Sequence, residues 1–215
     1  MPLHPIIDCP PHEMLALDLS VSNPELTDET FPTLADFEHW LTAKLASTGK
    51  RMAAGGYNEH RKWYQRYPDR FGEGENARCI HLGMDVWAPA GTPLYAPMDA
   101  RIHSWANNAG TGNYGPTLVL ELTHQGEPLY ALFGHLAEAD CANWNREGFK
   151  AGEVIAHLGA PRENGGWAPH VHVQLMRDME GWKGDYVGVC TLNERARMLA
   201  NCPDPGWMLG GGEEF

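Results

Sequence analysis

The chain has 215 residues, enough for one domain with a self-sufficient hydrophobic core. Hydrophobic residues make up 43% of it and charged residues 20%, a balance that excludes disordered, collagen-like and membrane-spanning classes. With 16 basic and 28 acidic residues the formal charge is -12 at pH 7, so nucleic acid is not expected as a partner.

The cysteines and the first residues bear on the compartment. Five scattered cysteines without a close C-x-x-C pair suit a reducing compartment better than a disulfide framework. Residues 1–8 lack a basic stretch followed by an apolar one, and no window reaches the roughly 20 apolar residues of a membrane helix. The sequence as given therefore predicts a cytoplasmic protein with no membrane partner, or an exported one if a leader has been removed.

The N-terminal part predicts one strand and two helices. Apolar and polar residues alternate at 14–21, which predicts a short strand. Apolar residues recur at helical spacing over 33–47, where Thr33 and Asp36 form a capping pattern and a glycine follows. The aromatic-rich run at 57–67, between two glycines and a proline, predicts a second helix.

Beyond residue 72 the sequence changes to short apolar runs separated by Gly and Pro. These runs predict strands at 79–86, 93–96, 100–105, 117–122, 130–133, 154–158 and 170–176. Many short strands with turns between them favour an antiparallel β core. A helix is predicted at 191–200, and a frayed tail from Gly210.

The fold class that follows is mainly β: an antiparallel, sandwich-like sheet core with N-terminal and C-terminal helices, α+β overall. The simplest division of the chain has an α-rich section at 1–71, the β core at 72–180, and a C-terminal helix and tail at 181–215.

Groups that can bind a metal or move protons gather in three short segments. These are HLGMD at 81–85, GHL at 134–136 and HVH at 170–172. Residues two apart on a strand project from one face, so His170 and His172 can enter the same pocket. Imidazole and carboxylate are suitable zinc ligands, and a catalytic zinc site keeps one position for water. Each segment alone has an ordinary structural explanation, whereas their combination points to a metal site.

Four longer stretches resemble one known family. They are HLGMDVWAPAGTPLYAPMDARI at 81–102, NNAGTGNYGPTLVLEL at 107–122, LFGHL at 132–136 and GWAPHVHVQL at 166–175. They resemble the lysostaphin/LytM-type zinc endopeptidases, metallopeptidase family twenty-three, with the H-x-x-x-D, A-P-x-G-T-P, G-H-L and P-H-x-H elements in the family's order.

The resemblance implies a ligand set and a reaction. His81, Asp85 and His172 match the three metal ligands and would hold one zinc ion per chain. His135 and His170 match the two histidines that flank the reacting carbonyl, and which of them takes the proton is left open. The implied activity is hydrolysis of an amide or peptide bond by a metal-activated water, on a peptide or peptidoglycan-type substrate. Nothing in the pattern bears on the oligomeric state.

Two departures from the family pattern keep alternatives open. Gln174 stands where an acidic residue is common, and residues 161–168 replace the T-G-x-S-T-G-like stretch that usually precedes the H-x-H strand. One alternative is a metal-binding module with a regulatory or scaffolding role, related to modules of intracellular fusion proteins. Another is a cupin-like iron or manganese site, although the acidic residue that it needs downstream is missing.

Other candidates have plainer interpretations. His103, His124 and His157 are expected to be structural or surface residues. Tyr114, in the G-N-Y-G stretch, is expected either to line a substrate groove or to pack in the core.

Overall fold

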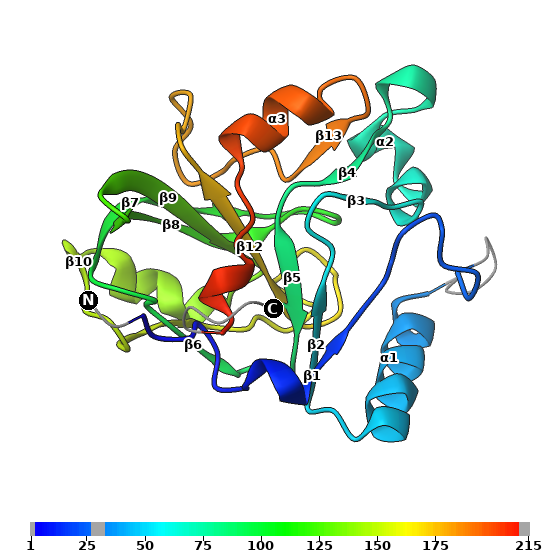
Figure 1. Ribbon diagram of the computed structural model, residues 1–215, viewed down its shortest axis with the longest axis horizontal. Coiled ribbons are helices and arrows are strands. Elements are labelled where there is room, and N and C mark those ends of the chain that lie inside the picture. The colour runs from blue at the N-terminus through cyan, green and yellow to red at the C-terminus, as the bar shows by residue number, and fades with distance from the viewer. Residues whose placement is uncertain (1–2, 27–32, 211–215) are drawn as a thin grey trace.

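The computed structural model describes residues 3–26 and 33–210 (Figure 1). An eight-stranded sheet in the order β1-β2-β5-β12-β9-β8-β7-β10 forms its centre. Its strands are β1 (Met14–Ala16), β2 (Met52–Gly55), β5 (Met84–Trp87), β7 (Ala100–Asn108), β8 (Gly115–His124), β9 (Glu127–Gly134), β10 (Gly148–Phe149) and β12 (His170–Met176). Every neighbouring pair is antiparallel except β1 with β2, which is parallel. The predicted mainly β fold is confirmed.

Two small sheets and short helices surround this sheet. One small sheet joins β13 (Val189–Thr191), β4 (Arg78–His81) and β3 (Glu59–His60), and the other joins β11 (Val154–His157) and β6 (Pro93–Tyr95). The α-helices are α1 (Leu34–Thr48), α2 (Pro68–Phe71) and α3 (Arg195–Asn201). The 3-10 turns are η1 (Pro11–Glu13), η2 (Trp63–Arg66), η3 (Gly74–Asn76), η4 (Glu138–Trp144) and η5 (Gly206–Met208). In Figure 1, α1 stands beside β1 and β2, and α3 lies near β13.

The central strand β12 divides its side chains between a core and a polar pocket. All seven of its residues are buried. Val171, Val173 and Leu175 belong to the largest hydrophobic cluster, which also contains Leu120 of β8 and Phe133 of β9. Because successive side chains of a strand point to opposite faces, the two histidines of the H-x-H run are turned away from this cluster. Both histidines line one pocket, as the alternation of side chains predicts.

Helix α1 forms as its end signals predict. Thr33 and Asp36 make a reciprocal capping box, and Gly49 ends the helix in the left-handed conformation with φ 67°. The buried residues Phe37 and Leu41 pack in a cluster that also contains Trp87 of β5. This packing fixes α1 against the edge of the sheet that is formed by β1, β2 and β5.

Two predicted elements are wrong in detail. The run at 57–67 is not an α-helix, because part of its backbone pairs with β4 as strand β3 and the rest forms the turn η2. The single strand predicted at 79–86 is two strands in different sheets, broken beside Gly83. A Cβ atom at Gly83 would stand 2.5 Å from the carbonyl oxygen of Val173 and 2.7 Å from the His172 ring, so only glycine fits.

Other boundaries shift by a few residues. The strand predicted at 14–21 ends at Ala16, and the helix predicted at 191–200 begins at Arg195 because Thr191 still belongs to β13. Except for Gly210, the predicted tail lies outside the described residues.

The N-terminal part shares the central sheet. Strand β2 pairs with β5, so the section at 1–71 extends the sheet that carries Asp85 and His172. The three-part division of the chain stays a prediction. Within the described ranges, no helix has the length and apolar character needed to cross a membrane.

Replacing Leu120 by Ala tests the position of β8 in the core. Leu120 is 0% exposed, so the substitution should lower the free energy of unfolding by about 2–5 kcal/mol through lost burial and a residual cavity. Urea unfolding followed by tryptophan fluorescence measures the change. Leu192→Ala is the matched control, because Leu192 is 55% exposed and should change stability by less than about 0.5 kcal/mol. Equal effects at the two sites would contradict the buried placement of β8.

Candidate metal centre

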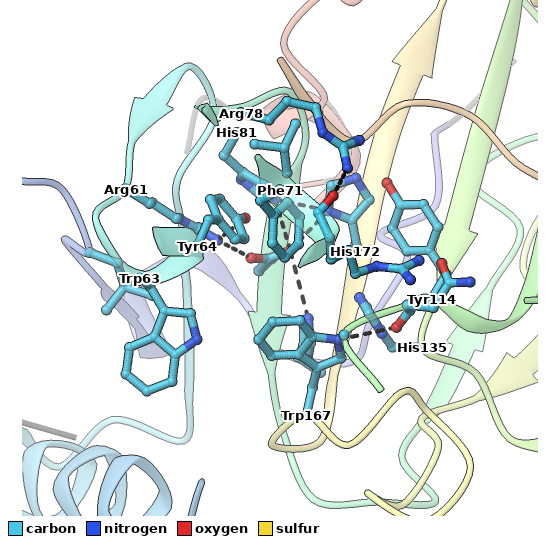
Figure 2. A pocket seen from close by; sticks show the side chains of 18 of the residues that line it. Arg61, Trp63, Tyr64, Phe71, Arg78, His81, Tyr114, His135, Trp167 and His172 are labelled. Carbon is cyan, nitrogen blue, oxygen red and sulfur yellow. Dashed lines mark hydrogen bonds and ion pairs between the residues drawn. The ribbon is translucent and has the colours of Figure 1, made fainter. Parts of the chain in front are cut away.

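Three side chains from three strands meet at one buried point. One ligand atom from each of His81, Asp85 and His172 lies within 4.8 Å of the others. His81 ends β4, Asp85 is the second residue of β5, and His172 is the third residue of β12. In the antiparallel register, His172 stands directly opposite Asp85. The structure therefore brings together all three ligands predicted from the sequence (Figure 2).

Hydrogen bonds on the outer ring nitrogens determine which nitrogen of each histidine faces the centre. His81 Nδ1 donates to the carbonyl oxygen of Gly56 at 2.9 Å, and His172 Nε2 donates to Oε1 of Gln174 at 3.0 Å. His81 Nε2 and His172 Nδ1 therefore turn inward, 2.9 Å apart and 3.3 and 3.1 Å from Oδ1 of Asp85. Two imidazole nitrogens and one carboxylate oxygen with oriented outer atoms are a donor set that fits catalytic zinc.

Gln174 serves this arrangement although it departs from the family pattern. Its amide nitrogen donates to the carbonyl oxygen of Val187 at 3.1 Å and contacts the Cys202 thiol at 3.4 Å. These bonds leave its Oε1 facing His172 as an acceptor. A carboxamide is therefore sufficient to orient the ligand here.

Arg61 holds the other oxygen of Asp85, and no sequence pattern singles it out. Its Nη1 lies 2.6 Å from Asp85 Oδ2, and its Nε lies 2.5 Å from Glu59 Oε2. The side chains of Arg61 and Asp85 are only 5% and 4% exposed. Burial alone would raise the pKa of Asp85, but His81 and Arg61 together hold it well below its usual value. Asp85 is thus ionised, and its Oδ1 is the oxygen that faces the two inward histidine nitrogens.

His135 and His170 lie beside the three ligands. Their ring centroids are 4.2 Å apart, and His170 Nε2 is 3.9 Å from Oδ1 of Asp85. Nδ1 of His135 donates to the carbonyl of Asn164 at 2.8 Å, and Nδ1 of His170 donates to that of Ala168 at 2.7 Å. Burial lowers the pKa of both rings, so each is neutral near pH 7 with Nε2 available to accept a proton.

The backbone of His135 is itself unusual. Its φ is 64°, in the left-handed region that a histidine seldom adopts. Its amide nitrogen donates to the carbonyl of Tyr114 at 2.8 Å, and its carbonyl accepts from Gly159 at 2.9 Å. The surrounding chain thus holds the residue in a strained conformation, which is common at functional sites.

Tyr114 packs against these histidines. Its ring centroid is 5.1 Å from that of His172 and 5.3 Å from that of His135. Its hydroxyl is buried and has no hydrogen-bond partner among the described residues, and burial raises its pKa well above the usual value. The group is therefore a protonated donor at the edge of the site, which agrees with the groove-lining interpretation.

The other histidines have their own partners. His103 contacts the Tyr130 ring, His124 stacks on Trp207, and His157 bonds Asp140. None of these three lies on the wall of the pocket that contains the ligands.

The geometry defines a buried His-Asp-His centre with two neutral histidines in a β-sheet pocket, the kind of site that metal-dependent hydrolases use. Residues 79–187, just over half of the chain, match the model of Peptidase family M23, and the chain belongs to this family. The family predicted from the sequence is confirmed.

Two curated relatives are named as peptidases. The DD-carboxypeptidase/endopeptidase Mpg of Neisseria meningitidis serogroup B is 32% identical over 124 residues, which are 56% of this chain and 26% of that protein. Mpg of Neisseria gonorrhoeae matches to the same extent. The chain thus spans about a quarter of the length of these relatives.

The solved structures match more weakly. The catalytic domain of the antimicrobial peptidase lysostaphin from Staphylococcus simulans has 20% identity and a TM-score of 0.40, covering 74% of this chain and 96% of that one. A putative peptidase M23 from Pseudomonas aeruginosa has 18% identity and a TM-score of 0.38, covering 85% of this chain and 65% of that one. Family membership rests on the family model and not on these likenesses.

Replacing Arg61 by Met tests the buried ion pair behind Asp85. Methionine keeps much of the apolar stem but leaves Asp85 and Glu59 without their cation, which should destabilise the metal-free protein by about 3–5 kcal/mol. Urea unfolding in the presence of a chelator measures the loss. Arg51→Met is the control, since its pair with Glu13 is exposed to solvent and should contribute little to stability. If the two substitutions had the same small effect, Arg61 would not be a structural counter-ion.

Proposed function

We propose that this protein is a zinc-dependent peptidase that hydrolyses an amide or peptide bond with a metal-activated water. The observation that carries the proposal is the convergence of three ligand atoms with fixed outer hydrogen bonds beside two neutral histidines. Bound zinc would lower the pKa of a water molecule and polarise the substrate carbonyl.

The chain's own residues divide the work. His81 Nε2, His172 Nδ1 and Asp85 Oδ1 would hold one zinc ion per chain. Nε2 of His135 or His170 would accept a proton from the attacking water, and the protonated ring would then donate a hydrogen bond to the negative charge that develops on the carbonyl oxygen. Because both rings are anchored through Nδ1, the reactive nitrogens keep their direction through this exchange.

A peptidoglycan-type peptide is the substrate class that we propose. Family membership supports it, as does the name of the Neisseria relatives, DD-carboxypeptidase/endopeptidase. The pocket around the centre has a volume of about 190 Å³ and is lined by aromatic side chains, among them Trp63, Trp87 and Trp167. Such walls would bind a peptide and exclude water from the reacting bond.

The alternatives fit less well. A non-catalytic metal-binding module is disfavoured because all three ligands and both neighbouring histidines are retained in one arrangement. A cupin-like site would need a downstream carboxylate on the metal, whereas Gln174 contacts the outer nitrogen of His172.

Metal content tests the ligand set. Protein purified without added metal should carry about one zinc per chain by elemental mass spectrometry, and His81→Ala and His172→Ala should each lose it. His103→Ala is the matched control, because His103 lies on β7 outside the pocket and its loss should leave the zinc in place. Zinc that survives both ligand substitutions would place the metal elsewhere.

Replacing His135 by Ala tests catalysis separately from metal binding. The variant should keep its zinc, and its kcat should fall by a factor of roughly 10²–10⁴, because the ring would serve in proton transfer and not as a ligand. Release of amines from a panel of peptides and peptidoglycan fragments measures the activity, and His124→Ala is the control. If fully metallated wild-type protein cleaved nothing in the panel, the non-catalytic alternative would be favoured.

A further inference from the structure

Besides Arg61, two further arginines line the same pocket as the metal centre. Arg70 lies in α2, and Arg78 is the first residue of β4, three residues before His81. Nη2 of Arg78 donates to the main-chain carbonyl of Arg70, and its guanidinium lies 5.4 Å from the centre of the Phe71 ring. Figure 2 shows Arg78 and Phe71 together at the border of the site. The two arginines are thus held on one side of the pocket by the short segment that leads into β4.

The carboxylates that act on the positive charge of this pair lie at longer range. Neither guanidinium takes part in an ion pair among the described residues, although the chain has a large excess of acidic groups. Burial and the charge of Arg78 lower the pKa of Arg70, while Asp185 acts in the opposite direction. The carboxyl of Asp185 has a pKa that is raised by its own burial. Asp185 therefore acts on Arg70 and Glu194 interacts with Arg78, each from beyond ion-pair distance, while both guanidinium groups are partly buried.

The side chain of Arg70 is placed along the wall of the pocket. Its Cδ atom lies 3.0 Å from the position that a Cβ on Gly112 would occupy, and Cζ2 of Trp167 lies 3.9 Å from that same position. The guanidinium makes no hydrogen bond within the described part of the chain, and the pocket also contains Tyr114 and Asn113. An anionic group that entered from the side of the metal centre would meet the planar guanidinium of Arg70, with its parallel N–H donors, beside aromatic side chains. Such an arrangement is suited to carboxylate binding.

We infer that Arg70 and Arg78 form a subsite for the free C-terminal carboxylate of a peptide substrate, so that the enzyme removes a short C-terminal segment. This inference rests on the proposed function. Arg78 and His81 are three residues apart on one strand, which separates their Cα atoms by about 10 Å. An extended peptide covers that distance in about three residues, so the segment released is one to three residues long. The reaction remains hydrolysis: the C–N bond breaks, the acyl carbon takes the hydroxyl of water, and the leaving amine takes the proton.

Matched peptides that end in an acid or an amide test the subsite. The probes are N-acetylated tetra-alanine peptides with L and with D terminal residues, each as free acid and as carboxamide. Zinc-loaded wild-type protein should cleave an acid roughly ten- to hundredfold faster than its amide in kcat/KM. Arg70→Gln and Arg78→Gln should raise KM for the acid about tenfold and reduce the acid preference to near one. Arg101→Gln, an exposed arginine on β7, removes the same charge and should change neither value.

Binding to metal-free protein separates this inference from the proposed function. A chelator removes zinc, so the metal cannot hold the carboxylate in this experiment. Calorimetric titration should then show binding of the acid but not of the amide, and Arg70→Gln should abolish binding of the acid. Acid-selective binding without hydrolysis of any probe would keep the subsite and defeat the proposed function. Three results would overturn the subsite and leave the peptidase proposal standing. They are equal cleavage of acid and amide, absence of acid binding, and acid selectivity that survives Arg70→Gln in a folded variant.

Discussion

The register of β12 between β5 and β9 is the constraint on which the site depends. His172 is paired with Asp85 on one side and with Gly134, the residue before His135, on the other. One strand therefore places a candidate ligand, its carboxylate neighbour and a candidate acid/base histidine side by side. A slip of one residue would turn both histidines of β12 into the hydrophobic cluster and bring the valines to the pocket. Burial of Val171, Val173 and Leu175 in that cluster is what specifies the register.

Close packing around His172 depends on small neighbours. A Cβ atom on Gly83 would stand 2.7 Å from its ring, and one on Gly188 would collide with the Tyr114 hydroxyl. Glycine at these two positions lets β4, β12 and the segment before β13 approach one another closely. The break between β4 and β5 lies beside Gly83. It allows His81 to reach the centre from a different sheet than Asp85.

Local sequence patterns predicted the three residues that converge at the centre. The residues that support them are brought there by long-range contacts. The H-x-x-x-D and H-x-H spacings and the G-H-L turn are short-range signals, and the strand alternation that they rely on is present in the fold. Arg61 could not be found in this way, since it lies 24 residues from Asp85 inside a run whose aromatic residues resemble a helix. The orienting role of Gln174 was hidden for a related reason: its amide is fixed by Val187 and Cys202, which follow it by 13 and 28 residues. Side chains that support a ligand from a distant segment have no fixed spacing from it.

The buried charges around Asp85 are better explained by preparation of the centre for a cation than by a contribution to the stability of the fold. Taking Arg61, Asp85 and Glu59 out of water is expensive, and well-packed apolar side chains often stabilise a fold at least as well. The arrangement does, however, prepare the centre for a cation. Burial first, and then the nearby charge of Arg61, lower the pKa of His81 to about 4, so its inward nitrogen carries a free lone pair at neutral pH. Asp85 is ionised at the same pH, and both histidines have fixed directions. A metal ion would therefore meet an ionised Asp85, a neutral His81 and a His172 ring of fixed direction, and this preorganisation is a functional reason for burying the charges.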